Sequence, residues 1–416
     1  MVLYPAGAIT LNATTTNPIP QRFFVLLAGF FSQLLCLGVA RFAYTPLLPL
    51  MQQQTGLDDA GGGYLAAVNY LGYMAGALLA SNLSSVTLKD TLYRLGLVLA
   101  VLSTIGMALT ENVYLWSFWR FVAGLSSAGS MLLASALILH WLLNHKQRAE
   151  LGIHFAGLGF GIALAALLVE FMLQAQFDWR TQWQYLAVFG VLLAIPAWRW
   201  LPKPVMSASS MQTTIADAPP GKRFIRLMLA SYFCAGYGYV ISATFIVTIV
   251  ERMPGLAGSG NLSFIVLGLA ATPAVLLWDL IARKTGYLKA VMLALLAQSV
   301  AILLPLWCSS LTAVLLSAAL FGATFVGVVS LVLTMAGRLY PGKPARLMGK
   351  MTLAYGSAQV LAPALTGYLA SRTGYYDIGL YLASAFVALG AVLIAVLIVT
   401  DQTAQQLDAL SAAAVK

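Results

Sequence analysis

Three charged side chains lie inside otherwise apolar stretches of the sequence: Arg41, Arg120 and Glu170. A charge near the middle of a membrane costs from about 3 to more than about 10 kcal/mol, so a charge kept there is a candidate functional group. A guanidinium stays charged at physiological pH and holds a carboxylate by two parallel hydrogen bonds. A buried carboxyl group can gain and lose a proton. These residue types fit the binding of an anion together with the transfer of a proton.

Their positions place the three charges at a similar depth. Arg41 lies about nine residues from the end of its stretch, Arg120 nine residues after Glu111, and Glu170 eight residues before Asp178. At about 1.5 Å per helical residue, each is roughly 12–14 Å below the same surface. We therefore expect Arg41, Arg120 and Glu170 to form one substrate and coupling centre. The open alternative is a structural ion pair or triad that joins three helices.

One glutamate cannot neutralise two arginines, and this imbalance favours the functional interpretation. The remaining positive charge would attract an anionic substrate or lower the proton affinity of Glu170. No comparable charge is expected at mid-membrane in the second half of the chain.

The elements that must position these charges are about twelve apolar stretches. Hydrophobic residues make up 60% of the chain and charged residues 9%, well below the quarter that is usual in soluble domains. Each stretch is long enough to cross a hydrocarbon core of about 30 Å as a helix. The expected spans are 23–50, 62–84, 92–110, 114–139, 149–175, 183–201, 223–250, 262–282, 288–308, 310–336, 346–371 and 376–400.

Basic residues alternate between the gaps that separate these stretches. Eighteen of the 23 lysines and arginines fall in the two tails and the even-numbered gaps, whereas the odd-numbered gaps hold three basic and six acidic residues. Cytoplasmic loops retain lysine and arginine, which predicts that both termini and the long middle loop are cytoplasmic. The net charge of +10 therefore reflects topology, and nucleic-acid binding is excluded.

The predicted fold is an all-α membrane protein with twelve transmembrane helices in two six-helix bundles. A cytoplasmic tail (1–22) precedes the first bundle (23–201), a Pro- and Ser-containing cytoplasmic linker (202–222) separates it from the second bundle (223–400), and a cytoplasmic tail (401–416) follows. The halves resemble weak repeats, which is typical of alternating-access transporters with a site between the halves. The tail at 1–22 lacks the apolar core of a signal peptide.

Cofactor and metal chemistry find no support in the sequence. Cys36, Cys234 and Cys308 have no paired spacing, so neither a disulfide framework nor a zinc site is expected. A phosphate-binding loop of the Walker type is absent from the sequence, which argues against a chain that drives transport by ATP.

Several further side chains are expected to face the interior of the bundles. Candidate cavity residues combine amide and phenol groups, and each could equally serve packing or an interhelical hydrogen bond. They are Asn69, Tyr70, Tyr73, Tyr237, Gln298, Tyr355 and Gln359. Asp279 and Arg283 are four residues apart on one helix face and are expected to form a cytoplasmic gate, either paired or in contact with the facing half.

Four runs of residues resemble a known family. They are Arg41-Phe-Ala-Tyr-Thr-Pro-Leu-Leu-Pro49, Asn69-Tyr-Leu-Gly-Tyr73, Gly236-Tyr-Gly-Tyr-Val-Ile-Ser-Ala-Thr244 and Gly349-Lys-Met-Thr-Leu-Ala-Tyr-Gly356. Together they resemble the YbfB/YjiJ-like branch of the major facilitator superfamily over about residues 22–400. This resemblance implies two six-helix bundles, rocker-switch alternating access and secondary active transport, and it implies no particular substrate.

The sequence matches the motifs of the superfamily to different degrees. The loop after the second helix usually carries Gly-x-Leu-x-Asp-Arg-x-Gly-Arg, whereas Ser81-Asn-Leu-Ser-Ser85 stands here without the acid. The second copy, Asp279-Leu-Ile-Ala-Arg-Lys-Thr-Gly286, keeps the basic pair and the glycine. The helix 4 motif is present as Arg120 and Gly124.

These features predict a secondary active transporter of a small molecule. Uptake into reconstituted vesicles, with and without a pH gradient, is the most informative test of this prediction. We expect a proton-coupled transporter of an organic anion, active as a monomer in the lipid bilayer of a bacterial inner (plasma) membrane. Efflux of drugs or amphipathic metabolites is the alternative. Two other classes, a membrane-embedded enzyme and a channel or receptor, fit less well, because the outer loops lack convergent acids and a channel needs no paired halves.

Overall fold

The computed structural model describes residues 19–148, 150–204, 220–339 and 344–401. Most of the two predicted tails and of the predicted linker 202–222 lies outside these residues. All regular structure in the described part is helical. In chain order the elements are α1 (Ile19–Gln33), η1 (Leu34–Phe42), α2 (Tyr44–Thr55), α3 (Asp59–Ser81), α4 (Val86–Ala108), α5 (Val113–Ala128), η2 (Gly129–Leu133), α6 (Ala134–Asn144), α7 (Gly152–Gln174), α8 (Trp179–Arg199), α9 (Lys222–Glu251), α10 (Gly260–Ala271), α11 (Ala274–Thr285), α12 (Tyr287–Trp307), α13 (Leu311–Leu339), α14 (Pro344–Thr373) and α15 (Asp377–Thr400).

Most of these helices can cross a membrane. Within the described residues, nine continuous helices are long and apolar enough, and the bent pair α10–α11 makes a tenth. Two of the nine, Gln21–Thr55 and Val113–Asn144, run through the short π-helices η1 and η2. The helices α8 and α14 are of similar length but fall outside this set, so the predicted total of twelve spans stays an expectation.

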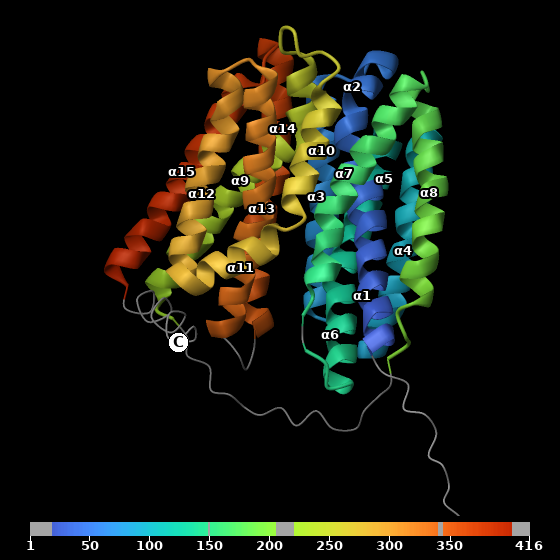
Figure 1. The fold of residues 1–416 in the computed structure, drawn as a ribbon. Coiled ribbons are helices and arrows are strands. Elements are labelled where there is room, and N and C mark those ends of the chain that lie inside the picture. Colours follow the sequence, from blue (N-terminus) through green and yellow to red (C-terminus); the bar gives the residue numbers. More distant parts are fainter. Residues whose placement is uncertain (1–18, 149, 205–219, 340–343, 402–416) are drawn as a thin grey trace, which may run out of the picture.

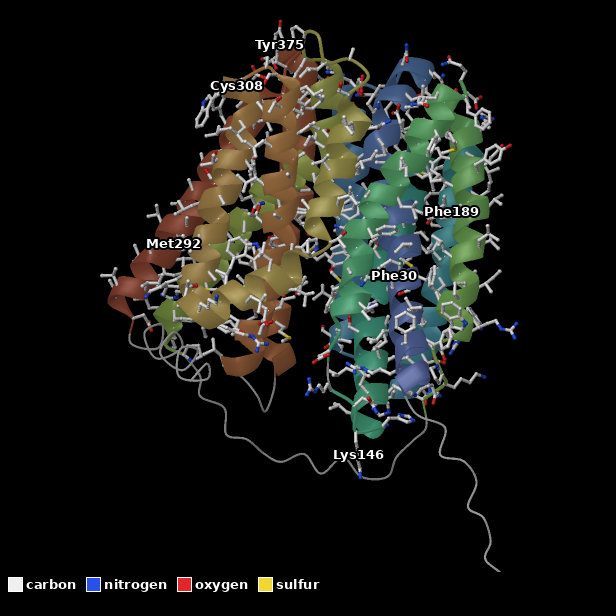
Figure 2. The ribbon with its side chains drawn as sticks, viewed as in Figure 1. Phe30, Lys146, Phe189, Met292, Cys308 and Tyr375 are labelled. Carbon is white, nitrogen blue, oxygen red and sulfur yellow. The ribbon has the colours of Figure 1, made fainter. Side chains whose placement is uncertain are left out.

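The helices form two groups that lie side by side. Helices α1–α8 make up one group and α9–α15 the other (Figure 1). Helix α1 begins and α15 ends at the same end of the molecule. Figure 2 marks this end by Lys146 and the opposite end by Cys308 and Tyr375. We call these the basic end and the far end.

Glycines let the two groups approach closely. A Cβ atom on Gly63 of α3 would collide with the backbone oxygen of Pro363 in α14. A Cβ atom on Gly159 of α7 or on Gly268 of α10 would likewise collide with the facing backbone. Small residues permit such contacts between helices in lipid. The pairs α3–α14 and α7–α10 therefore form the seam between the groups.

A bend between α10 and α11 interrupts the seam toward the basic end. Helices α10 and α11 meet at an angle of 47°. Pro273 lies at the break, and proline removes a backbone donor and clashes with the preceding turn. Leu276 near the start of α11 still meets Gly152 at the start of α7, and beyond it α11 turns away, so that α11 and α6 lie apart (Figure 1).

Candidate functional site

The site is built on a π-helical segment in the first transmembrane helix. Within η1 the backbone widens, and the Ala43 amide donates to the carbonyl of Gly38, five residues earlier, at 2.9 Å. Gly38 lies directly against Gly161 of α7, where a Cβ atom would meet the Gly161 backbone at 2.7 Å. Segments of π-helix are frequent at functional sites because they redirect side chains. Arg41 is the next-to-last residue of this segment.

Arg120 holds the π-helical segment from the neighbouring helix. Its Nη1 donates to the carbonyls of Ala40 and Arg41 at 3.3 and 3.2 Å, and its guanidinium lies 4.3 Å from the ring centre of Tyr44. Ser127, two turns further along α5, donates to the carbonyl of Cys36 at 2.8 Å. Helix α5 thus supplies the donors that the widened backbone of η1 requires.

Arg41 is enclosed by aromatic rings. Its guanidinium carbon lies 4.5 Å from the ring centre of Tyr70 and 4.6 Å from that of Tyr73, both on α3. Thr45, one turn after Arg41, donates to the carbonyl of Ala243, one turn after Tyr239, so Tyr239 of α9, in the other group of helices, lies at the same level. The side chain is buried, and its Nε has no hydrogen-bond partner in the described part of the chain. Aromatic faces stabilise the cation without neutralising it.

The predicted triad does not form. Glu170 accepts hydrogen bonds at 3.0 Å from Gln174 and, across the seam, from Asn261 of α10. Among the described residues, no ion pair joins a carboxylate to Arg41 or Arg120. The described residues therefore contain no ion pair or triad among Arg41, Arg120 and Glu170, and a shared substrate and coupling centre stays a prediction.

The helical spacing of α7 explains this difference. Gly157 and Gly161 face the first helix, whereas Gly159, Ala163 and Glu170 lie on the face toward α10. Positions separated by four, seven and eleven residues share one helix face. The direction around the helix therefore differed from the prediction. Glu170 also lies only four residues from the end of α7, so it is nearer the far end than expected.

Four of the predicted cavity residues lie around the two arginines or next to them. Tyr70 and Tyr73 face Arg41, and Asn69 donates to the Arg120 carbonyl at 2.8 Å. Tyr355 of α14 packs on Tyr239, with ring centres 5.9 Å apart. Gln359, one turn after Tyr355, is buried, and its Oε1 has no partner within the described residues.

Two predicted cavity residues lie elsewhere. Tyr237 stacks on Phe386 of α15 at 4.2 Å between ring centres, inside the second group of helices. It lies two residues from Tyr239, which turns it to another face of α9. Gln298 is buried in α12, with an Nε2 that lacks a partner among the described residues, and no described contact links it to Arg41.

The predicted gate residues form an ion pair on α11. Nε and Nη2 of Arg283 lie 2.8 and 2.7 Å from Oδ2 of Asp279. Tyr287 donates to the other oxygen of Asp279 at 3.4 Å. All three residues belong to the second group of helices, so the described contacts of this pair do not reach across to the first.

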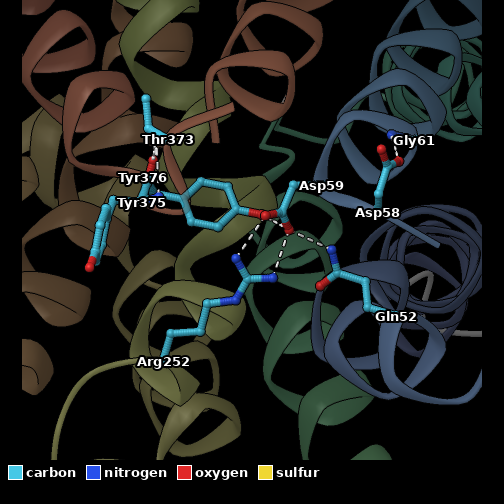
Figure 3. A network of polar contacts seen from close by, with 8 residues as sticks. All are labelled: Gln52, Asp58, Asp59, Gly61, Arg252, Thr373, Tyr375 and Tyr376. Atoms are coloured by element: carbon cyan, nitrogen blue, oxygen red, sulfur yellow. Dashed lines mark hydrogen bonds and ion pairs between the residues drawn. The ribbon is translucent and has the colours of Figure 1, made fainter. Parts of the chain in front are cut away.

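A second polar network joins the two groups at the far end. Asp59 at the start of α3 accepts two hydrogen bonds from Arg252, which follows α9, at 2.7 and 2.8 Å (Figure 3). The same carboxylate accepts from Gln52 of α2 and from Tyr376, which precedes α15, both at 2.7 Å (Figure 3). We call Gln52, Asp59, Arg252 and Tyr376 the far-end latch, because two members come from each group.

The donors of the far-end latch keep their protons. The Asp59 carboxylate raises the pKa of the Arg252 guanidinium above its usual value. Burial, and next the charge of Asp59, raises the pKa of the Tyr376 phenol. Thr45 adds a further bond across the seam, donating to the carbonyl of Ala243 at 2.9 Å. The far end is therefore closed by polar contacts, whereas α11 and α6 lie apart at the basic end.

Sequence reasoning treated Asp59 and Arg252 only as loop charges. Both charges were visible in the sequence, since Asp59 begins α3 and Arg252 follows the end of α9. Their pairing depends on how the two groups are docked, and no local pattern records that. The π-helix η1 was missed as well, since its widening results from packing against α5 and α7.

Comparison with known proteins identifies the family. The family described as uncharacterised MFS-type transporter YbfB matches residues 33–396. The chain belongs to this family. It is therefore a major facilitator transporter of small molecules and an integral membrane protein, and not an enzyme.

Individual relatives are more distant. A probable sulfoacetate transporter, SauU of Cupriavidus necator, is 25% identical over 82% of this chain and 86% of its own length. The niacin transporter NiaP of Acinetobacter baylyi is 24% identical over 39% of this chain and 37% of its own. The crystal structure of the nucleoside transporter NupG matches the fold with a TM-score of 0.71, at 12% identity, over 92% of this chain and the whole of that one.

Proposed function

We propose that this transporter moves a small organic anion together with protons, by alternating access between its two groups of helices. The observation that supports it is the buried guanidinium of Arg41, which has aromatic neighbours and no carboxylate partner among the described residues. A buried charge without a counter-ion is costly. An anionic substrate would supply the counter-ion, and two relatives are named for acids, sulfoacetate and niacin.

The two arginines have different roles in this proposal. Arg41 binds the anion, since no carboxylate pairs with its guanidinium and its Nε has no hydrogen-bond partner within the described residues. Arg120 is a positioning residue, since it donates to the η1 carbonyls of Ala40 and Arg41. Its positive charge also repels that of Arg41 and so adds to the attraction for an anion.

Efflux of lipophilic cations is the competing function, and a ligand panel separates the two. We expect small carboxylates to raise the melting temperature of the purified transporter and lipophilic cations to leave it unchanged, because Arg41 repels a cation. The measurement is thermal unfolding in detergent or nanodiscs with each compound in turn. Stabilisation by the cations alone would reject the anion proposal.

Glu170 is the proposed proton-coupling residue. Its described partners are the side-chain amides of Gln174 and Asn261, which donate to its two oxygens, and no cation pairs with it among the described residues. Asp59 by contrast is bound to the cation Arg252, which favours its charged form. Glu170 also contacts the other group of helices, so a change in its protonation acts directly on the seam.

Replacing Glu170 with glutamine tests the coupling. We expect Glu170→Gln to keep substrate exchange in proteoliposomes but to lose accumulation driven by a pH gradient, because glutamine keeps the hydrogen bond to Asn261 and carries no proton. Glu111→Gln is the matched control, since Glu111 is an exposed far-end carboxylate paired with Arg180 inside one group. Wild-type accumulation and pH dependence in Glu170→Gln would remove Glu170 from the mechanism.

The orientation in the membrane completes the proposal. We infer twelve passes in a bacterial inner membrane, with both tails and the linker 202–222 on the cytoplasmic side. This is supported by Lys146 at the basic end, where α1 begins and α15 ends (Figure 2). Both halves of the proposed site come from one chain, so a monomer suffices. In this orientation the far-end latch closes the outer side.

A further inference from the structure

The second group of helices presents a column of aromatic rings to Arg41. Tyr239 of α9 lies nearly parallel to Phe325 and Phe321 of α13, with ring centres 5.0 and 6.4 Å away. On α14, Tyr355 stacks on Tyr239 at 5.9 Å and lies 4.5 Å from Tyr232. The interplanar angles within this column lie between 6° and 31°. We call these five residues the aromatic column.

The aromatic column and Arg41 come from opposite groups of helices. Arg41 belongs to η1, between Tyr70 and Tyr73 of α3. Thr45, one turn after Arg41, donates to the carbonyl of Ala243, one turn after Tyr239, so Tyr239 is the column ring at the level of Arg41. A ligand that touches both would bridge the two groups. Such a ligand needs a flat π-surface for one contact and a negative charge for the other.

The charge balance limits the ligand to one acidic group. Neither Arg41 nor Arg120 has a carboxylate partner among the described residues, but the Nη1 of Arg120 donates to two backbone carbonyls, whereas Arg41 lies between the rings of Tyr70 and Tyr73. A second carboxylate would therefore meet phenol rings instead of a cation.

We propose that the substrate is a planar aromatic monocarboxylate, whose carboxylate binds Arg41 and whose ring stacks on Tyr239 of the aromatic column. This inference rests on the proposed transport of an organic anion and names its chemical class. Flat rings gain from offset stacking on aromatic side chains, whereas a saturated ring of equal size gains only burial. Selectivity for planar over puckered acids is therefore the distinguishing property.

The test compares two acids of equal charge and nearly equal size. We expect benzoate to bind the full-length transporter in nanodiscs about tenfold more tightly than cyclohexanecarboxylate by calorimetry, corresponding to about 1.4 kcal/mol for the ring contact with Tyr239. Acetate should bind most weakly, and benzylamine should not bind. The Tyr239→Leu variant should bind benzoate and cyclohexanecarboxylate with equal affinity. Its binding of cyclohexanecarboxylate should still be measurable.

Tyr237→Leu is the matched control, because Tyr237 lies on the same helix but stacks on Phe386, away from the column. It should keep the wild-type ratio of the two acids. If Tyr239→Leu does not fold, Tyr355→Leu provides the second test. Equal wild-type affinities for benzoate and cyclohexanecarboxylate would overturn the aromatic inference and leave the anion proposal standing. Binding of benzylamine alone, or of none of the acids, would overturn both.

Discussion

Replacing Arg41 with glutamine is expected to weaken anion binding by at least about 30-fold, since truncating one partner of a buried charge pair costs about 2–5 kcal/mol. The substitution should leave the melting temperature of the ligand-free protein unchanged or higher. It removes a buried cation that has no carboxylate partner in the part of the chain the structure describes. The measurements are calorimetric titration with benzoate and thermal unfolding without ligand.

Arg120 provides the contrast that separates binding from positioning. Arg120→Gln should lower both the melting temperature and the affinity, because it removes the donor to the carbonyls of Ala40 and Arg41 in η1. Arg120→Lys should also be damaging, because a lysine ammonium cannot reproduce the planar guanidinium over Tyr44. A loss of stability in Arg41→Gln as large as that in Arg120→Gln would make Arg41 a structural residue instead.

Disrupting the far-end latch is expected to shift the transporter toward a state that is open at the far end. Asp59→Asn removes the charge that binds Arg252 and weakens the bond from Tyr376. The Arg252 side chain is 42% exposed, so we expect the substitution to change the free-energy difference between the two states by only about 1–2 kcal/mol. This corresponds to a roughly 5- to 30-fold change in the ratio of the two states. A change of this size is measurable when both states are populated.

Spin labels at the far end can report this shift. Tyr114 and Tyr375 are both exposed, one in each group of helices, and cysteines there can be labelled after Cys36, Cys234 and Cys308 are replaced. Asp59→Asn should increase the population at longer label–label distances. The control Arg180→Gln removes a far-end ion pair with Glu111 that lies within one group, at 3.0 Å, and should not. Equal distance distributions in Asp59→Asn and wild type would show that the network does not hold the halves together.

The sequence allowed the family, the helical class and the position of Arg41 to be predicted, because apolar length and charge placement are local properties. The depth of Glu170 was overestimated, because α7 ends four residues after it and not at Asp178. Its direction was not readable from the sequence, since the face that Glu170 presents depends on the glycine crossings Gly161–Gly38 and Gly159–Gly268 on two sides of α7.

The far-end latch shows the second limit of sequence reasoning. Asp59 and Tyr376 are 317 residues apart, and their contact exists only because α3 and α14 dock through Gly63 and Gly367. Tyr237 and Tyr239 show a third limit of sequence reasoning. Both are tyrosines on one buried helix, and only the packing of α13, α14 and α15 decides which of them faces Arg41.

Accumulation of benzenesulfonate in proteoliposomes tests the central claim most directly. This aromatic anion has one charge and, unlike benzoic acid, does not cross lipid as a neutral acid when a pH gradient is imposed. The wild-type protein should accumulate it under an inward proton gradient and lose that accumulation with a protonophore, while Arg41→Gln liposomes should match protein-free ones. Wild-type accumulation no greater than in protein-free liposomes, or equal accumulation by Arg41→Gln, would contradict proton-driven anion transport through Arg41.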